Sequence, residues 1–145
     1  MSFPEPRPGL VIRYAYLWKR EQDKGFEDGL KPRPCAVVLS LRKAEGPPLV
    51  RVLPVTHSPP GEGEPAVEIP RATKARLGLD ADRSWIILSE SNVFMWPGPD
   101  LRSLPGQDPS TIAHGMLPRE FFLHLQAKFL ELAEKGRSAT VHRSE

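Results

Sequence analysis

The sequence predicts a mainly β fold, in which several short strands form a small, strongly bent antiparallel sheet or barrel and a helix closes the chain. Seventeen prolines among 145 residues break the chain into short segments and argue against a mostly helical fold. β-branched and aromatic residues gather in short runs between polar or proline-rich stretches, as is typical of strands. Near the C-terminal end, by contrast, apolar residues recur at helical spacing.

The first strand is predicted at residues 9–18, where Val, Ile, Tyr, Leu and Trp follow Gly9. Residues 35–41 form a nearly all-apolar run, which indicates a strand covered on both faces. Pro54 favours an edge or a bend near the end of the next strand. The remaining runs are bounded by prolines, glycines or polar residues, and they predict strands at 49–55, 66–69, 84–89 and, after a kink, 92–96.

Two helices are predicted. Residues 70–77 fit a short helix, with Pro70 in its first turn and Gly78 as its stop. Residues 118–136 fit a longer helix whose apolar stripe indicates packing against the sheet. That stripe consists of Phe121, Phe122, Leu125, Phe129 and Leu132.

The chain has the length of one domain, and we find no internal repeat. Residues 1–8 are expected to form a proline-rich arm, residues 9–136 the folded domain, and residues 137–145 a polar, frayed tail. Within the domain, residues 19–32 are predicted to be a long polar loop, and residues 101–115 are predicted to be irregular.

Composition excludes several classes of protein. A hydrophobic content of 39% is too high for a disordered chain, and a net charge of +2 confines any nucleic-acid-binding surface to a local patch. The one cysteine, Cys35, forms no internal disulfide, and its apolar neighbours favour a small buried residue over a nucleophile. No run approaches the roughly 20 apolar residues of a membrane span, and the first residues lack a signal peptide's apolar run. These features predict a cytoplasmic protein.

The sequence predicts neither a metal site nor a cofactor. It has no Gly-rich phosphate loop, no His-Glu-x-x-His motif and no paired cysteines. The acidic residues between 21 and 28 are more typical of a solvated charge run than of a cation site. The histidines are far apart in the sequence, at His57, His114, His124 and His142.

Three polar patterns are candidates for function. Prolines on both sides restrict Arg33 just before the apolar run. Thr56, His57 and Ser58 stand together at the end of a predicted strand. Residues 89–92 interrupt another apolar run, and strand alternation places Glu90 and Asn92 on one face. Each pattern is a weak signal by itself, because strand ends commonly carry polar residues.

In this order, the patterns resemble the PemK/MazF family of type II toxin–antitoxin ribonucleases. The resemblance covers residues 9–136, and the stretch 90–98 looks like a subgroup of PemK-like growth inhibitors. Its most specific part is the Arg-Pro pair before an apolar strand together with a Pro-x-Thr element. The sequence departs from the family pattern by one extra residue after Arg-Pro, by Arg13 in the first strand, by His57 after the threonine and by Glu90 where the family has Asp.

The resemblance implies an SH3-like barrel, a homodimer, an antitoxin protein as partner and metal-independent cleavage of single-stranded RNA. It carries the catalytic roles to Arg33 and Thr56, and the acidic position to Glu90. Contacts to RNA are then expected from His57, Ser58, Asn92 and Arg13.

Cleavage through the 2′-hydroxyl of RNA requires a base, donors for the charged phosphorane and an acid for the leaving oxygen. Arg33 suits the phosphorane, because a guanidinium matches two phosphate oxygens. Glu90 is the candidate base. His57 is its rival, because an imidazole has an ordinary pKa of about 6.5.

Two alternatives stay open. The aromatic side chains of the first strand, Tyr14, Tyr16 and Trp18, either stack on unpaired bases or belong to the core or a dimer contact. The rival to an enzyme is a binding module, in which the same fold grips RNA or a protein without turnover.

Overall fold

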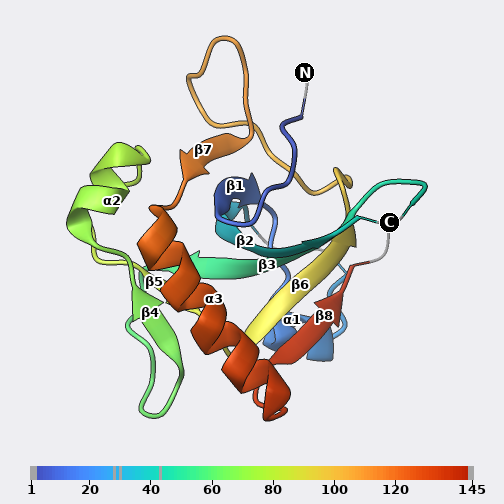
Figure 1. Ribbon diagram of the computed structural model, residues 1–145, viewed down its shortest axis with the longest axis vertical. Helices are drawn as coiled ribbons and strands as arrows, with labels where there is room; N and C mark the ends of the chain where they lie inside the picture. The colour runs from blue at the N-terminus through green and yellow to red at the C-terminus, as the bar shows by residue number, and fades with distance from the viewer. Residues whose placement is uncertain (1–2, 28, 30, 43, 144–145) are drawn as a thin grey trace.

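A computed structural model describes residues 3–27, 29, 31–42 and 44–143 and confirms a mainly β fold (Figure 1). It contains three helices, of which two were predicted. The strands are β1 (Leu10–Tyr14), β2 (Arg33–Leu41), β3 (Leu49–Thr56), β4 (Ala66–Glu68), β5 (Trp85–Ile87), β6 (Glu90–Met95), β7 (Ala113–Met116) and β8 (Ala139–His142). The helices are α1 (Lys19–Asp23), α2 (Arg71–Arg76) and α3 (Arg119–Glu134).

The eight strands form one sheet in the order β4-β5-β3-β2-β1-β7, with β6 pairing with β3 and with β8. All pairs are antiparallel except β6 and β8, which run parallel, in contrast to the purely antiparallel sheet expected. Along the edge opposite β2, strand β3 pairs first with β6 and then, at Val55 and Thr56, with β5. Among the described strands the pairing does not close into a barrel.

Strand β2 is buried on both faces over residues 35–38, as its apolar run predicted, whereas Leu39 and Ser40 are half-buried and Leu41 is exposed. Cys35 and Val37 belong to a cluster on one side of the sheet, and Ala36 and Val38 belong to a cluster on the other. Burial raises the pKa of the Cys35 thiol, so that the thiol stays protonated. The interpretation of Cys35 as a small buried residue is therefore confirmed.

Helix α3 lies diagonally across one face of the sheet (Figure 1). Its stripe buries Phe122, Leu125 and Phe129, while Phe121 and Leu132 pack half-buried against the same cluster. Burial of each large apolar side chain contributes roughly 1.5–3 kcal/mol. The predicted stripe is thus the contact that holds α3 on the sheet. No helix in the described part of the chain is long and apolar enough to cross a membrane.

The aromatic residues around β1 belong to the core. Tyr14, Tyr16 and Trp18 are only 0%, 1% and 6% exposed. The ring of Tyr14 stacks on Phe94, with 4.5 Å between the centroids. The alternative that these rings belong to the core is therefore confirmed, and the guanidinium groups of Arg20 and Arg33 lie over the Trp18 ring.

Three segments differ from the prediction. The expected loop at 19–32 contains α1, where the Glu21 side chain accepts a hydrogen bond from the backbone N–H of Trp18 at 3.0 Å and so caps the helix start. The expected irregular stretch at 101–115 ends in β7, which pairs with β1. The expected frayed tail forms β8 beside β6. Strand pairing with distant residues decides both strands, and local composition does not show it.

The end of β8 is fixed by a buried arginine. Arg143 lies 3.0 Å from the Asp100 carboxylate, and both side chains are almost fully buried. The same guanidinium donates to Ala15 O at 2.7 Å, to Asn92 Oδ1 at 3.2 Å and to the Tyr14 hydroxyl at 3.3 Å. These contacts join the last strand to β1, to β6 and to the segment before residue 101.

Candidate functional site

Antiparallel pairing brings the start of β2 beside the end of β3, since Cys35 lies opposite Pro54. Arg33 begins β2 and Thr56 ends β3, so the pairing places both on the wall of one groove. This groove, of about 540 Å³, is the Arg33 groove; it is lined by Tyr16, Trp18, Arg20, Glu21, Lys31, Arg33, Thr56, His57 and Ser58. A smaller hollow of about 190 Å³ shares Lys31, Arg33, Thr56 and His57 with it.

Arg33 is held in place by its neighbours. Its Nη1 donates to the carbonyl of Val55 at 3.3 Å, and its guanidinium carbon lies 4.9 Å from the centroid of the Trp18 ring. The guanidinium of Arg20 lies 4.6 Å from the same centroid. With Lys31, three cations line the Arg33 groove against one carboxylate, that of Glu21, so the groove favours an anion.

Thr56 and Ser58 form the turn after β3. The backbone N–H of Ser58 donates to Thr56 Oγ1 at 3.1 Å. Because this bond uses the threonine oxygen as an acceptor, the hydroxyl proton of Thr56 remains available to a ligand. Ser58 is exposed and lines the same groove.

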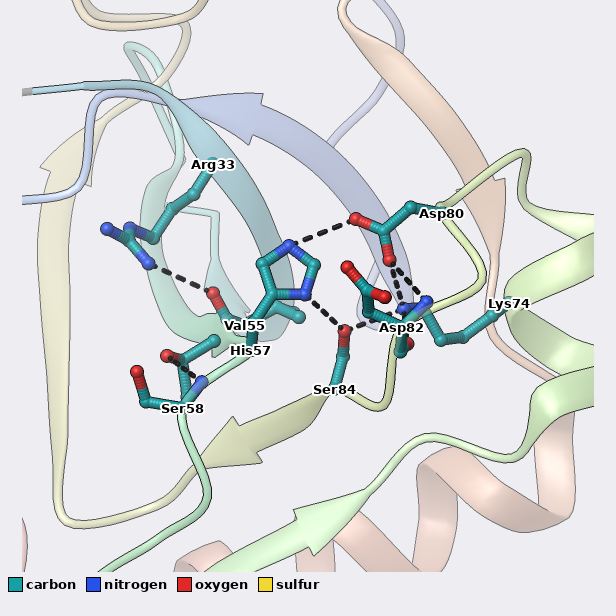
Figure 2. Close-up of polar contacts among 9 residues, drawn as sticks. Arg33, Val55, His57, Ser58, Lys74, Asp80, Asp82 and Ser84 are labelled. Carbon is teal, nitrogen blue, oxygen red and sulfur yellow. Dashed lines mark hydrogen bonds and ion pairs between the residues drawn. The ribbon is translucent and has the colours of Figure 1, made fainter.

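His57 lies between the Arg33 groove and a polar cluster from the α2–β5 segment (Figure 2). Its Nε2 is 3.0 Å from Asp80 Oδ2, and its Nδ1 is 3.4 Å from Ser84 Oγ. The side chain is 59% exposed. The two contacts orient the imidazole, as second partners do for a functional histidine.

A buried lysine organises this polar cluster. Lys74 is 5% exposed, and its ammonium donates to Asp80 Oδ1 and to Ser84 Oγ, each at 2.7 Å, and to the carbonyl of Asp82. The hydrogen bond from Lys74 lowers the pKa of Asp80, so its carboxylate stays ionised beside His57. These residues were not predicted from the sequence, where the only local signal is a lysine in a short helix followed by two aspartates.

Glu90 lies behind the Arg33 groove and does not line it. Its Oε1 accepts hydrogen bonds from the Tyr16 hydroxyl at 3.1 Å and from the backbone N–H of Lys19 at 2.9 Å. Burial raises the pKa of Glu90, and it also raises the pKa of the Tyr16 phenol, which therefore stays a donor. Since Tyr16 lines the groove, Glu90 is separated from a ligand by one side chain.

Asn92 has a structural role. It is fully buried, its Oδ1 accepts from Leu17 N at 2.9 Å, and its Nδ2 donates to Leu17 O at 2.8 Å. Glu90 and Asn92 do share a face, because both contact the segment that follows β1. The expectation that Asn92 contacts RNA is contradicted by its burial.

Arg13 lies outside the Arg33 groove. Its Nη1 donates to the carbonyl of Ser103 at 2.8 Å, in the segment between β6 and β7. It therefore does not join the expected RNA contacts, whereas His57 and Ser58 both line the groove.

One group of described side chains has the composition of a metal site. His57, Asp80 and Asp82 each present one donor atom, and these atoms lie within 4.8 Å of one another. The wide spacing of the histidines argued against a metal site, but the side chains grouped with His57 are aspartates from the segment between α2 and β5.

Comparison with known proteins identifies no relative: no family model, no curated protein and no solved structure matches the chain. The geometry of the Arg33 groove and the motif resemblance are therefore the observations that bear on function.

Proposed function

We propose that the chain is an endoribonuclease of the PemK/MazF type, which cleaves single-stranded RNA through the 2′-hydroxyl without a metal ion. The observation that carries the proposal is the shared groove of Arg33 and Thr56, the two residues on which the resemblance is most specific. They come from different strands, and pairing in the sheet brings them together beside His57.

The chemistry of the Arg33 groove suits a phosphodiester. Trp18 Nε1 and Arg33 Nε are buried N–H groups without a hydrogen-bond partner among the described residues, and both side chains line the groove. Buried donors in proteins are nearly always paired, and Arg33 is itself one of the three cations of the groove, so the lining favours an acceptor-rich anionic ligand. A phosphate of a single strand meets this description.

The position of each side chain relative to the Arg33 groove suggests its role in cleavage. A base removes the proton of the 2′-hydroxyl, the 2′-oxygen attacks phosphorus, and the 5′-oxygen leaves with a proton from an acid, which yields a 2′,3′-cyclic phosphate. Arg33 stabilises the charge of the phosphorane, and Thr56 donates its hydroxyl to a non-bridging oxygen. Two groups are placed to act as the base: His57 directly at the groove, and Glu90 through Tyr16.

Two substitutions separate these candidate bases. If His57 is the base, His57→Gln should lower the rate by about a hundredfold and remove the acid limb of the pH–rate profile, while Glu90→Gln should keep that limb. If Glu90 is the base, Glu90→Gln should instead lower the rate and remove the acid limb, while His57→Gln should keep that limb. Its acid limb should then lie above the pH range of an exposed carboxyl, because burial raises the pKa of Glu90. Rates for both variants are measured on one fluorogenic RNA between pH 4 and pH 9. Retention of the limb in both variants would reject both assignments.

A chelator experiment tests the proposal as a whole. Purified protein incubated with single-stranded RNA in excess EDTA should produce discrete fragments that end in a 2′,3′-cyclic phosphate. RNA that stays intact but forms a retarded complex favours the alternative, a binding module of the same fold. Cleavage that appears only after magnesium is added contradicts the metal-independent mechanism.

The proposal includes an SH3-like barrel type of fold, a homodimer and an antitoxin protein that covers the groove. An apolar hollow beside the β2–β3 hairpin supports a contact between two copies, because Leu41 is 59% exposed there next to Leu39 and Leu49. The cationic groove also suits an acidic segment of an antitoxin.

Light scattering of the wild type at ~50 µM, a concentration at which micromolar complexes persist, should give twice the chain mass, and Leu41→Asp should lower the measured mass. A monomeric wild type at that concentration would exclude the dimer.

A further inference from the structure

His57, Asp80 and Asp82 present a nitrogen and two carboxylates to one point at the rim of the Arg33 groove. Nε2 of His57 is 3.0 Å from Asp80 Oδ2, and the donor atoms of all three residues lie within 4.8 Å of one another. Zn–N and Zn–O bonds of roughly 2.0–2.2 Å place ligand atoms of a tetrahedral site about 3.4 Å apart. The spacing therefore requires only a small rotation of exposed side chains.

The Asp82 carboxylate has no hydrogen-bond or ion-pair partner among the described residues. Figure 2 shows this carboxylate pointing toward the His57 ring. The backbone of Asp82 is meanwhile held at both ends, since its N–H donates to Asp80 Oδ1 at 3.2 Å and its carbonyl accepts from Lys74. The residue is thus fixed in place while its side chain is free to bind.

The other two donors already have the supporting contacts that metal ligands need. Lys74 donates to Asp80 Oδ1, which leaves Oδ2 directed toward His57. Ser84 Oγ lies 3.4 Å from Nδ1 of His57, so it can accept the Nδ1 proton when Nε2 carries a metal. The buried ammonium of Lys74 also repels a metal cation bound at Asp80. We therefore expect a dissociation constant for the metal ion in the micromolar range.

We propose that His57, Asp80 and Asp82 bind a divalent transition metal ion, with zinc the best match, and that the bound ion occupies Nε2 of His57, so that this nitrogen cannot act as the base in RNA cleavage. Imidazole with two carboxylates suits zinc, nickel or copper; magnesium and calcium prefer oxygen ligands alone. The second part rests on the proposed function: an ion held there inhibits RNA cleavage and takes no part in it.

Calorimetric titration of the untagged full chain with zinc chloride tests the site without reference to activity. Wild type should bind one equivalent, and Asp82→Ala should lower the affinity at least about tenfold. Asp23→Ala, which removes an exposed carboxylate outside the cluster, should bind zinc like wild type. Nuclear magnetic resonance of 15N-labelled histidine should show Nε2 of His57 shifting with one equivalent of zinc. Absence of binding, equal affinity of Asp82→Ala, or an unchanged His57 signal would overturn the site.

A cleavage assay then separates this proposal from the proposed function. Zinc should inhibit the wild type at concentrations that fill the site, and Asp82→Ala should need about tenfold more zinc for the same inhibition. Full-rate cleavage by zinc-saturated protein would overturn the inhibitory role. A chain that binds zinc through His57 but never cleaves RNA would refute the nuclease and leave the metal site intact.

Discussion

Arg33→Ala is expected to lower the rate of RNA cleavage by about a hundredfold or more, which corresponds to a loss of roughly 3 kcal/mol of transition-state stabilisation. The reason is positional: Arg33 lies in the groove beside Thr56 and His57, and its Nε lacks a partner among the described residues. Arg33→Lys should restore only part of the rate, because an ammonium cannot bind two phosphate oxygens side by side. The rate constant is measured with saturating RNA in EDTA.

Arg20→Ala is the matched control for Arg33→Ala. Both guanidinium groups lie over the Trp18 ring, at 4.6 Å for Arg20 and 4.9 Å for Arg33, but Arg20 is exposed. Loss of Arg20 should therefore raise KM for RNA more than it lowers kcat. Circular dichroism and Tm of both variants must stay near wild type. If Arg33→Ala cleaves at the wild-type rate, the nuclease assignment fails at its most specific residue, and the binding module becomes the better explanation.

Arg143→Met is expected to reduce the free energy of unfolding by about 3–5 kcal/mol, the usual cost of breaking a buried ion pair from one side. The substitution leaves the Asp100 carboxylate, which is 8% exposed, without the guanidinium 3.0 Å away. It also removes the hydrogen bond to Ala15 O and releases β8 from β1. Urea-induced unfolding followed by tryptophan fluorescence measures the change.

Two further variants show whether the orphaned charge is the cause. Arg137→Met, at an exposed arginine just after α3, should change the free energy of unfolding by less than about 0.5 kcal/mol. Adding Asp100→Asn to Arg143→Met should recover part of the loss, because it removes the buried unpaired charge. Equal stabilities of Arg143→Met and Arg137→Met would show that β8 does not depend on this contact.

Features that depend on local pattern were predictable. The apolar run of β2 and the stripe of α3 follow from side-chain periodicity, which is a property of neighbouring residues. Helix α1 was missed because its residues are polar and its start depends on one capping side chain, Glu21. Strands β7 and β8 were missed because each is short and is stabilised by a distant partner strand.

In the candidate site, too, some residues follow the local sequence pattern and others do not. Arg33, Thr56 and His57 stand out in the sequence because prolines and strand ends mark their positions, and the structure brings all three to one groove. Asn92 shows the same local pattern, yet its amide is buried against Leu17. A polar residue near the start of a strand thus gives no information on whether its side chain faces a ligand or the backbone.

The β class, the positions of the main strands along the chain and the packing face of α3 follow from local sequence pattern, which also singles out Arg33 and Thr56 as candidate site residues. Three features depend instead on the packing of distant elements: the burial of Lys74, the grouping of Asp80 and Asp82 with His57, and the contacts of Arg143 that hold the last strand. The physical reason is that periodicity and turn preferences act over a few residues. The burial and charge of a polar group depend instead on which distant elements pack around it.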